Sequence, residues 1–260
     1  MPEWLVVILL GAIEGVTEFL PISSTGHLLL AERWLPRQID LFNVVIQSGA
    51  GLAVLLVFTK RVRQLFQDWR QPATQDYLLK LSAAFVITCV GGVLLKATGF
   101  KLPEQAAPVA WATLVGGVLI LIIEAAISRR KLSDEITWTI AIAIGVAQLV
   151  AAAFPGASRS GTTILFALML GLNRPLATEF SFLLGIPTLL AAGALEIFSA
   201  MRHGGIEPIP WSMVLLGTIA SAVTAFVAVK WLLRFVQTHT FMIFGWYRIT
   251  LGAAILILLR

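Results

Sequence analysis

Long apolar segments separated by short polar connections dominate the chain. Six of them have about the 20 residues that a membrane-spanning helix needs. These segments are 41–59, 78–98, 108–128, 177–198, 212–234 and 241–259. The pattern therefore predicts an all-α polytopic membrane protein with six transmembrane helices.

Two further apolar stretches, 4–30 and 137–172, are each interrupted by a polar break that contains proline. The breaks are Pro21–His27 and Pro155–Thr163. Non-helical backbone at membrane depth survives only where protein or a water-filled cavity surrounds it. We therefore expect each stretch to form a re-entrant helix pair, and we expect the two breaks to meet in one site.

The two breaks also resemble each other. Phe19–Gly26 and Phe154–Gly161 share Phe, Ser and Gly at a constant offset, and three spanning segments follow each. An odd number of crossings in each half makes the halves inverted, as in many transporter folds. We expect one membrane domain, 1–260, built from repeats of approximately 1–131 and 132–260.

Composition excludes an ordinary soluble protein. Apolar residues make up 58% of the chain and charged residues 13%, whereas soluble domains carry about 25% charge. The formal net charge is +5. In a membrane protein, an excess of basic residues is explained by the loops that stay in the cytoplasm, so we expect no nucleic-acid partner. Basic residues crowd the loops at 60–70 and 129–131, whereas 99–107 and 199–211 hold only Lys101 and Arg202. The crowded loops are expected in the cytoplasm.

Ionisable residues inside apolar segments are costly in a membrane and usually functional. Eight occur here: Glu14, Glu18, His27, Glu124, Arg159, Glu179, Glu196 and Arg248. Glu14 and Glu18 share one helix face, where their carboxylates repel unless a cation, a basic residue or a shared proton intervenes. Glu124 and Glu196 are expected to reach water at helix ends. Arg248 is expected to form an ion pair or a phosphate contact, and Glu179 to have a structural role.

The first break carries hydroxyls beside a histidine. Ser23, Ser24 and Thr25 precede His27. Together with the nearby carboxylates, they could supply a nucleophile, a base and an orienting acid. This clustering favours catalysis over a purely structural histidine.

The second break predicts an anion site. Arg159 lies in a glycine- and hydroxyl-rich turn that opens a helix, where main-chain amides and a guanidinium together suit phosphate. The residues expected to hold phosphate with Arg159 are Ser158, Ser160, Thr162 and Thr163. Helix capping would also account for the hydroxyls, but it would not need the arginine.

Glu14 to His27 (EGVTEFLPISSTGH) and Pro155 to Thr163 (PGASRSGTT) closely resemble the two signature segments of the bacterial undecaprenyl-pyrophosphate phosphatase family, known also for bacitracin resistance. Segments 42–50 and 179–184 resemble family sequence as well. The resemblance implies interdigitated inverted repeats in the bacterial cytoplasmic (inner) membrane, with a site that opens toward the periplasm. It implies hydrolysis of the C55 polyprenyl pyrophosphate to the monophosphate carrier lipid used for peptidoglycan.

The charge of a pyrophosphate suggests roles for individual residues, and the resemblance favours Ser24 among the hydroxyls. The expected catalytic set is Glu14, Glu18, Ser24, His27 and Arg159, with Ser23 and Thr25 added to the substrate-binding hydroxyls. The two glutamates are expected to bind a divalent cation, Mg²⁺ or Ca²⁺, and no organic cofactor is expected. The attacking group is Ser24, activated by His27 with a carboxylate behind it, or a water activated by the same residues. Alternatively, one glutamate acts as the base or orients His27.

A transporter or flippase for polyprenyl phosphate is the rival interpretation. Inverted repeats, broken helices and an anion site at the midplane are typical of secondary carriers too. The hydroxyl, histidine and carboxylate cluster favours the enzyme, because a carrier must bind phosphate but need not activate a nucleophile. The sequence leaves open whether the protein forms a homodimer.

Overall fold

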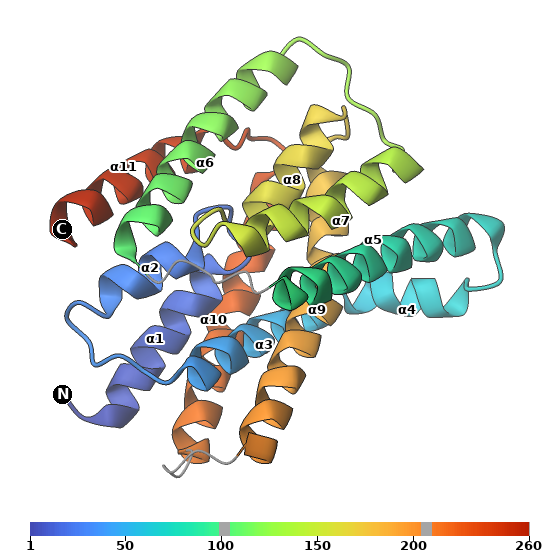
Figure 1. Ribbon diagram of the computed structural model, residues 1–260. Coiled ribbons are helices and arrows are strands. Elements are labelled where there is room, and N and C mark those ends of the chain that lie inside the picture. Colours follow the sequence, from blue (N-terminus) through green and yellow to red (C-terminus); the bar gives the residue numbers. More distant parts are fainter. Residues whose placement is uncertain (99–104, 204–209, 260) are drawn as a thin grey trace.

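The computed structural model describes residues 1–98, 105–203 and 210–259, and over these ranges the protein is built from helices (Figure 1). Apart from an isolated bridge between Ser133 and Leu172, the described part contains no β-structure. The helices are α1 (Glu3–Thr17), α2 (Ser24–Ala31), α3 (Asp40–Val57), α4 (Thr59–Gln67), α5 (Pro72–Ala97), α6 (Ala106–Ile127), α7 (Trp138–Ala153), α8 (Arg159–Met169), α9 (Arg174–His203), α10 (Trp211–Phe235) and α11 (Met242–Leu258).

Five of these helices are long and apolar enough to cross a membrane, namely α3, α5, α6, α9 and α10. The expectation of an all-α polytopic membrane protein is confirmed. The sixth predicted segment is α11, which is apolar but has only 17 residues. A sixth crossing therefore stays a prediction. Lys101, used in the count of loop charges, lies outside the described residues.

Each of the two interrupted stretches forms a helix, a turn and a second helix. The pairs are α1 with α2 and α7 with α8. The non-helical part is shorter than the sequence suggested, because α2 already begins at Ser24 and α8 at Arg159. The polar residues of each break therefore lie on the first turn of a helix, where main-chain N–H groups have no partner within the helix.

Packing between the two halves is reciprocal. The opening helix of the first half, α1, packs on α10 of the second half, whereas α7 of the second half packs on α5 of the first. Helices α6 and α11 lie side by side (Figure 1). Two interlocked repeats would pack in this way. The inverted arrangement and the boundary near residue 131 remain predictions.

Small residues bring α1 and α10 into direct main-chain contact. A Cβ added at Gly11 would lie 2.2 Å from the carbonyl oxygen of Gly217, and one added at Gly15 would lie 2.1 Å from that of Ser221. Small residues at a helix interface allow such close approach, which is a main source of helix association in membranes. This contact fixes α1, and with it the turn that α1 leads into.

Helix α4 was missed by the sequence analysis, which assigned its residues to a basic loop. It is a short amphipathic helix with Leu65 buried and Lys60 and Arg63 exposed. Arg61 Nε donates to Glu179 Oε1 of α9 at 2.8 Å. Glu179 therefore has a structural contact, as expected.

The expectation for Glu124 was wrong, because its carboxylate does not reach water. The residue is 2% exposed, and Arg174 Nε donates to Oε1 at 2.9 Å. The main-chain N–H of Phe241 donates to the same oxygen at 2.8 Å. Glu124 thereby ties α6 to the start of α9 and to the residue before α11.

Replacing Glu124 by glutamine should destabilise the protein. The variant keeps an acceptor for the Phe241 N–H but leaves the Arg174 guanidinium without its negative partner, which costs about 3 kcal/mol of folding free energy. The measurement is the thermal midpoint of unfolding in detergent. Glu196→Gln, at a partly exposed glutamate outside any ion pair described for the chain, is the control. Equal losses in the two variants would contradict the interpretation.

Candidate active site between two helical hairpins

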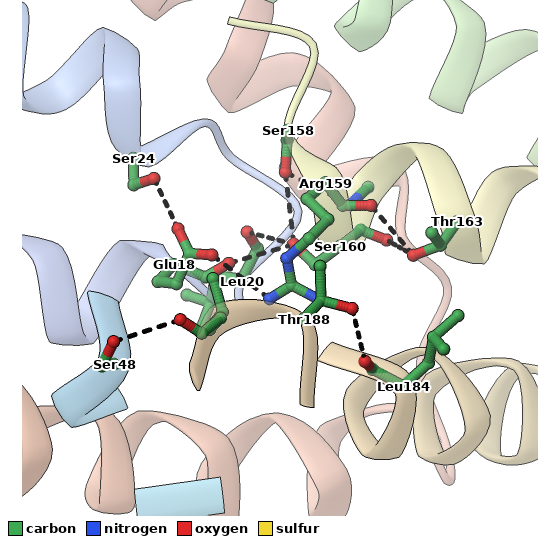
Figure 2. Close-up of polar contacts among 12 residues, drawn as sticks. Glu18, Leu20, Ser24, Ser48, Ser158, Arg159, Ser160, Thr163, Leu184 and Thr188 are labelled. Carbon is green, nitrogen blue, oxygen red and sulfur yellow. Dashed lines mark hydrogen bonds and ion pairs between the residues drawn. The ribbon is translucent and has the colours of Figure 1, made fainter. Parts of the chain in front are cut away.

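The turns of the two hairpins touch each other. Ser160 Oγ, at the start of α8, lies 3.0 Å from the main-chain oxygen of Leu20 and 3.3 Å from that of Glu18. Ser160 is fully buried, and Figure 2 shows these contacts joining the two turns. The expectation that the two breaks meet is confirmed.

The two turns share an unusual backbone conformation. Ser23 has φ 73° and Ser158 φ 67°, and among the described residues they are the two non-glycine residues with positive φ. Each serine caps the helix that follows, with its Oγ accepting the N–H of Gly26 or Gly161 at 3.2 Å. A side chain in this region is strained by roughly 1–3 kcal/mol, and such strain clusters at functional sites. The strain falls immediately before Ser24 and Arg159.

Glu18 is the centre of the polar contacts between the hairpins. Ser24 Oγ donates to Glu18 Oε2 at 2.7 Å, and Arg159 Nη2 donates to Oε1 at 3.2 Å (Figure 2). The residue is 7% exposed, so the ion pair is largely shielded from water. One carboxylate therefore holds a hydroxyl from the first hairpin and a guanidinium from the second.

Arg159 has two guanidinium nitrogens without a hydrogen-bond partner, Nε and Nη1, and both are buried. The guanidinium lies 5.0 Å from the ring centroid of Phe19, and a Cβ at Gly185 would lie 2.2 Å from Nη1. Glycine at position 185 thus makes room for the arginine. The side chain of Arg159 borders a cavity of about 140 Å³. The other residues that line this cavity include Glu18, Ser24, Thr25, Gln47, Pro155 and Ser158.

Glu14 has no partner of its own. It is 0% exposed, and neither carboxylate oxygen accepts a hydrogen bond. It borders a second cavity of about 210 Å³, which shares Ser24, Thr25, Gln47 and Pro155 with the first. Buried acceptors without donors call for a cation or a proton, so Glu14 fits either a bound proton or the expected divalent ion.

The protein alone would give such an ion few ligands. No group of three or more His, Cys, Asp or Glu side chains suited to a metal occurs among the residues that the structure describes. Glu14 and Glu18 would supply carboxylate oxygens and leave the other positions to phosphate and water. Mg²⁺ is commonly held in this way at sites that bind phosphate.

The Ser24–His27 couple expected from the sequence does not occur in the structure. His27 Nδ1 lies 2.7 Å from the main-chain oxygen of Ser23, and Nε2 lies 2.7 Å from the Tyr247 hydroxyl. Because a carbonyl can only accept, we assign the proton to Nδ1, which leaves Nε2 to accept from Tyr247. The bond to Ser23 turns the imidazole toward α11, while Ser24 is bonded to Glu18. This geometry agrees with the alternative in which a glutamate is the base.

Several polar residues near the site were missed by the sequence analysis, among them Tyr247 and Gln47. Tyr247 stacks on His27 with ring centroids 5.5 Å apart and an interplanar angle of 8°. Gln47, on α3, borders both cavities. A polar amide within an apolar spanning segment was a usable signal for Gln47. Nothing in the sequence pairs Tyr247 with a histidine 220 residues away.

Three hydroxyls expected to bind phosphate are bonded to the main chain instead. Ser160 bonds the first turn, Thr162 Oγ1 donates to the carbonyl of Ser158 at 2.9 Å, and Thr163 Oγ1 donates to that of Arg159 at 2.9 Å. None of the three is among the residues that border the two cavities. Their contact with phosphate stays a prediction that the geometry does not favour, whereas Ser24, Thr25 and Ser158 do border a cavity.

Arg248 does not form the ion pair that was one of the two expectations from the sequence, and its contact with phosphate stays a prediction. It is 0% exposed, and none of the ion pairs within the described residues includes it. Its guanidinium donates to main-chain carbonyls of both turns and of α6.

Comparison with known proteins identifies one family, and the match extends over nearly the whole chain. The family model described as "Bacitracin resistance protein BacA" matches residues 7–254. A protein of Rhizobium johnstonii named undecaprenyl-diphosphatase is 49% identical over 249 residues, covering 95% of this chain and 94% of its own. One of the same name from Xanthomonas oryzae pv. oryzae is 46% identical over 258 residues, covering 99% and 97%. The chain therefore belongs to the BacA family of bacitracin resistance proteins.

Proposed function

We propose that the protein is a membrane phosphatase that hydrolyses undecaprenyl pyrophosphate to undecaprenyl phosphate and inorganic phosphate. The observation that carries the proposal is the contact of Glu18 with both Ser24 and Arg159. It joins a hydroxyl nucleophile, a carboxylate that can take its proton and a guanidinium with unused N–H groups. The name undecaprenyl-diphosphatase, carried by relatives at 46–49% identity, supplies the substrate class.

The geometry supports attack by Ser24. Its Oγ would form a bond to the terminal phosphorus while the bond from that phosphorus to the bridging oxygen breaks, and Glu18 would take the hydroxyl proton. The lipid monophosphate leaves, and water then releases inorganic phosphate from the serine. Negative charge on the transferring group is met by Arg159 Nε and Nη1, because positioning and positive charge supply most of the catalysis in phosphoryl transfer.

A divalent cation fits beside these residues. Glu14 and Glu18 would hold Mg²⁺ or Ca²⁺, which supplies charge neutralisation to the pyrophosphate when bound. The support is the buried, unpartnered carboxylate of Glu14. Arg159 bonds to Glu18 and not to Glu14, so it does not supply the positive partner that Glu14 lacks.

The lipid part of the substrate needs an apolar surface close to the turns. A groove of about 650 Å³ between α6, α7 and α8 has a nearly apolar lining that includes Trp111, Val150, Phe154 and Ala157. Ala157 directly precedes Ser158, so the groove ends beside the second turn. A polyprenyl chain lying there would place its pyrophosphate near the site.

We place the protein in the bacterial cytoplasmic (inner) membrane, with substrate entering from the periplasm. The support for the orientation of the chain is the basic content of residues 60–70 and 129–131, which favours a cytoplasmic location for these segments. Entry from the periplasm is what the resemblance to the family implies. The carrier alternative has no comparable support. The Ser24–Glu18 bond prepares a nucleophile, and transport does not need one.

Purified protein in detergent should release inorganic phosphate from undecaprenyl pyrophosphate without any membrane gradient. Arg159→Ala should lower kcat by about 10²–10³-fold, since removing one donor to developing negative charge typically has that effect. Glu18→Ala should lose at least as much, because it removes the proton acceptor and the partner of Arg159 together. Arg234→Ala, at an exposed arginine on α10, is the control. A folded wild-type protein without phosphate release would overturn the proposal.

Variants of Ser24 and Tyr247 distinguish a mechanism in which Glu18 activates Ser24 from one in which His27 does. If Glu18 activates Ser24, Ser24→Ala should lose most activity, whereas Tyr247→Phe, which removes only the hydroxyl bonded to His27, should lose less than tenfold, in line with about 1 kcal/mol for a neutral hydrogen bond. The measurement is the steady-state rate of phosphate release. Full activity in Ser24→Ala would exclude the covalent route and leave the activated water.

The cation proposal can be tested without turnover. Mg²⁺ or Ca²⁺ added to chelator-treated wild-type protein should raise its thermal midpoint, because an ion that binds the folded state stabilises it. The shift should vanish in Glu14→Gln, which keeps the shape of the side chain but lacks the charge. Glu196→Gln should respond as the wild type does. An equal shift in Glu14→Gln would refute the assignment of the ion to this residue.

A further inference from the structure

Arg248 is a buried cation without an anionic partner in the described part of the chain. Taking a guanidinium out of water is costly unless every N–H group finds an acceptor. The side chain has five N–H donors, and five main-chain carbonyl oxygens surround it. A counter-ion is therefore not what holds it in place.

The five carbonyls belong to three separate segments. Nε donates to Thr113 of α6 at 3.1 Å, and Nη2 is 3.3 Å from the oxygen of Ala112 and 3.0 Å from that of Gly156. Nη1 is 2.9 Å from the oxygen of Ala157 and 3.5 Å from that of Pro21. One planar group thus contacts α6, the second turn and the first turn together.

Neighbouring residues are shaped to fit the guanidinium. A Cβ at Gly116 of α6 would lie 2.1 Å from Arg248 Nη2, and one at Gly161 of α8 would lie 3.0 Å from Nη1. The side chain of Thr113 adds a parallel link, since its Oγ1 lies 3.2 Å from the oxygen of Gly156 and 3.5 Å from Ser23 Oγ. The guanidinium therefore has a parallel hydroxyl link beside it, no room for a side chain at Gly116 and little room for one at Gly161.

The carbonyls held by Arg248 lie close in sequence to the reacting groups. Pro21 is three residues before Ser24, and Ala157 is two residues before Arg159. Arg248 itself borders neither cavity of the site. Its influence on the reaction must therefore act through the backbone of the two turns.

We propose that Arg248 is a positioning residue that sets the spacing between the two hairpin turns, and so places Arg159 against Glu18 and Ser24. The inference rests on the proposed phosphatase function only for its kinetic consequences. A misplacement of about 1 Å between reacting groups can lower a rate by about 100-fold. Substrate binding is less sensitive, because the apolar tail contributes to it independently of the turns.

The kinetic test compares Arg248→Met with Arg234→Met, the same change at an exposed arginine of α10. Arg248→Met should lower kcat by about 100-fold while KM changes by less than threefold, and Arg234→Met should behave as the wild type does. A rise in KM with unchanged kcat would overturn the proposal, because it would mean that Arg248 binds the phosphate directly. Wild-type kinetics in Arg248→Met would overturn it as well.

Two further variants separate geometry from charge. Arg248→Lys keeps the charge but has three donors instead of five, so its kcat should stay well below that of the wild type. Gly116→Ala keeps the arginine and fills the space beside Nη2, so it should show the same loss of kcat. Gly116 also lines the apolar groove, so the kcat of this variant is the test and its KM is not. If Arg248→Met fails to fold, Arg248→Lys and Gly116→Ala still test the positioning role. Wild-type kcat in both would refute the proposal.

The spacing itself can be measured without substrate. Cys89 is the single cysteine of the chain, so Cys89→Ser gives a background without thiols. In it, Ser24→Cys and Ser158→Cys, which come from different hairpins and both border the first cavity, can be joined by a short bifunctional thiol reagent. Adding Arg248→Met or Gly116→Ala should slow cross-linking at least severalfold, and adding Arg234→Met should not. Unchanged rates would overturn the positioning role. Lack of phosphate release by the wild type would instead overturn the proposed function and leave this result valid.

Discussion

Two helical hairpins end inside the protein, and the polar main-chain groups at their turns must find partners without the help of bulk water. The rest of the site depends on this constraint. On the donor side, Ser23 and Ser158 accept N–H groups at the starts of α2 and α8. On the acceptor side, Ser160 and Arg248 donate to carbonyls of the turns. Most of these bonds cross from one turn to the other or to a supporting helix.

This requirement divides the polar residues of the two breaks into two groups. Hydroxyls that bond to carbonyls form the first group: that of Ser160 joins the two turns, and that of Thr163 bonds back within the first turn of α8. Ser24, Glu18 and Arg159 remain directed at the cavity, and they are bonded to one another. A composition rich in Ser and Thr thus reflects the construction of re-entrant turns as much as the binding of phosphate.

Helix α11 organises the site from outside both hairpins. Its consecutive residues Tyr247 and Arg248 reach different targets, since Tyr247 fixes the ring of His27 and Arg248 joins the turns. Close packing of α11 on α6 holds these side chains in place, and a Cβ at Gly117 would lie 2.7 Å from the main-chain oxygen of Gly245. The last helix of the chain therefore controls groups supplied by the hairpins of both halves.

The sequence by itself determined the helices that could span a membrane, the two breaks and the residue types gathered there, because hydrophobic length and the cost of buried charge are local properties. It anticipated that the two breaks meet in one site, but not that Arg159 pairs with Glu18. Only the tertiary structure decided which partner each group has: Ser24 bonds Glu18 and not His27, and Arg248 bonds carbonyls and not a carboxylate. The first choice is made within one hairpin by the fold of its turn. The second brings Arg248 to segments 91 to 227 residues away, and it depends on main-chain carbonyls that every residue carries and no residue type reveals.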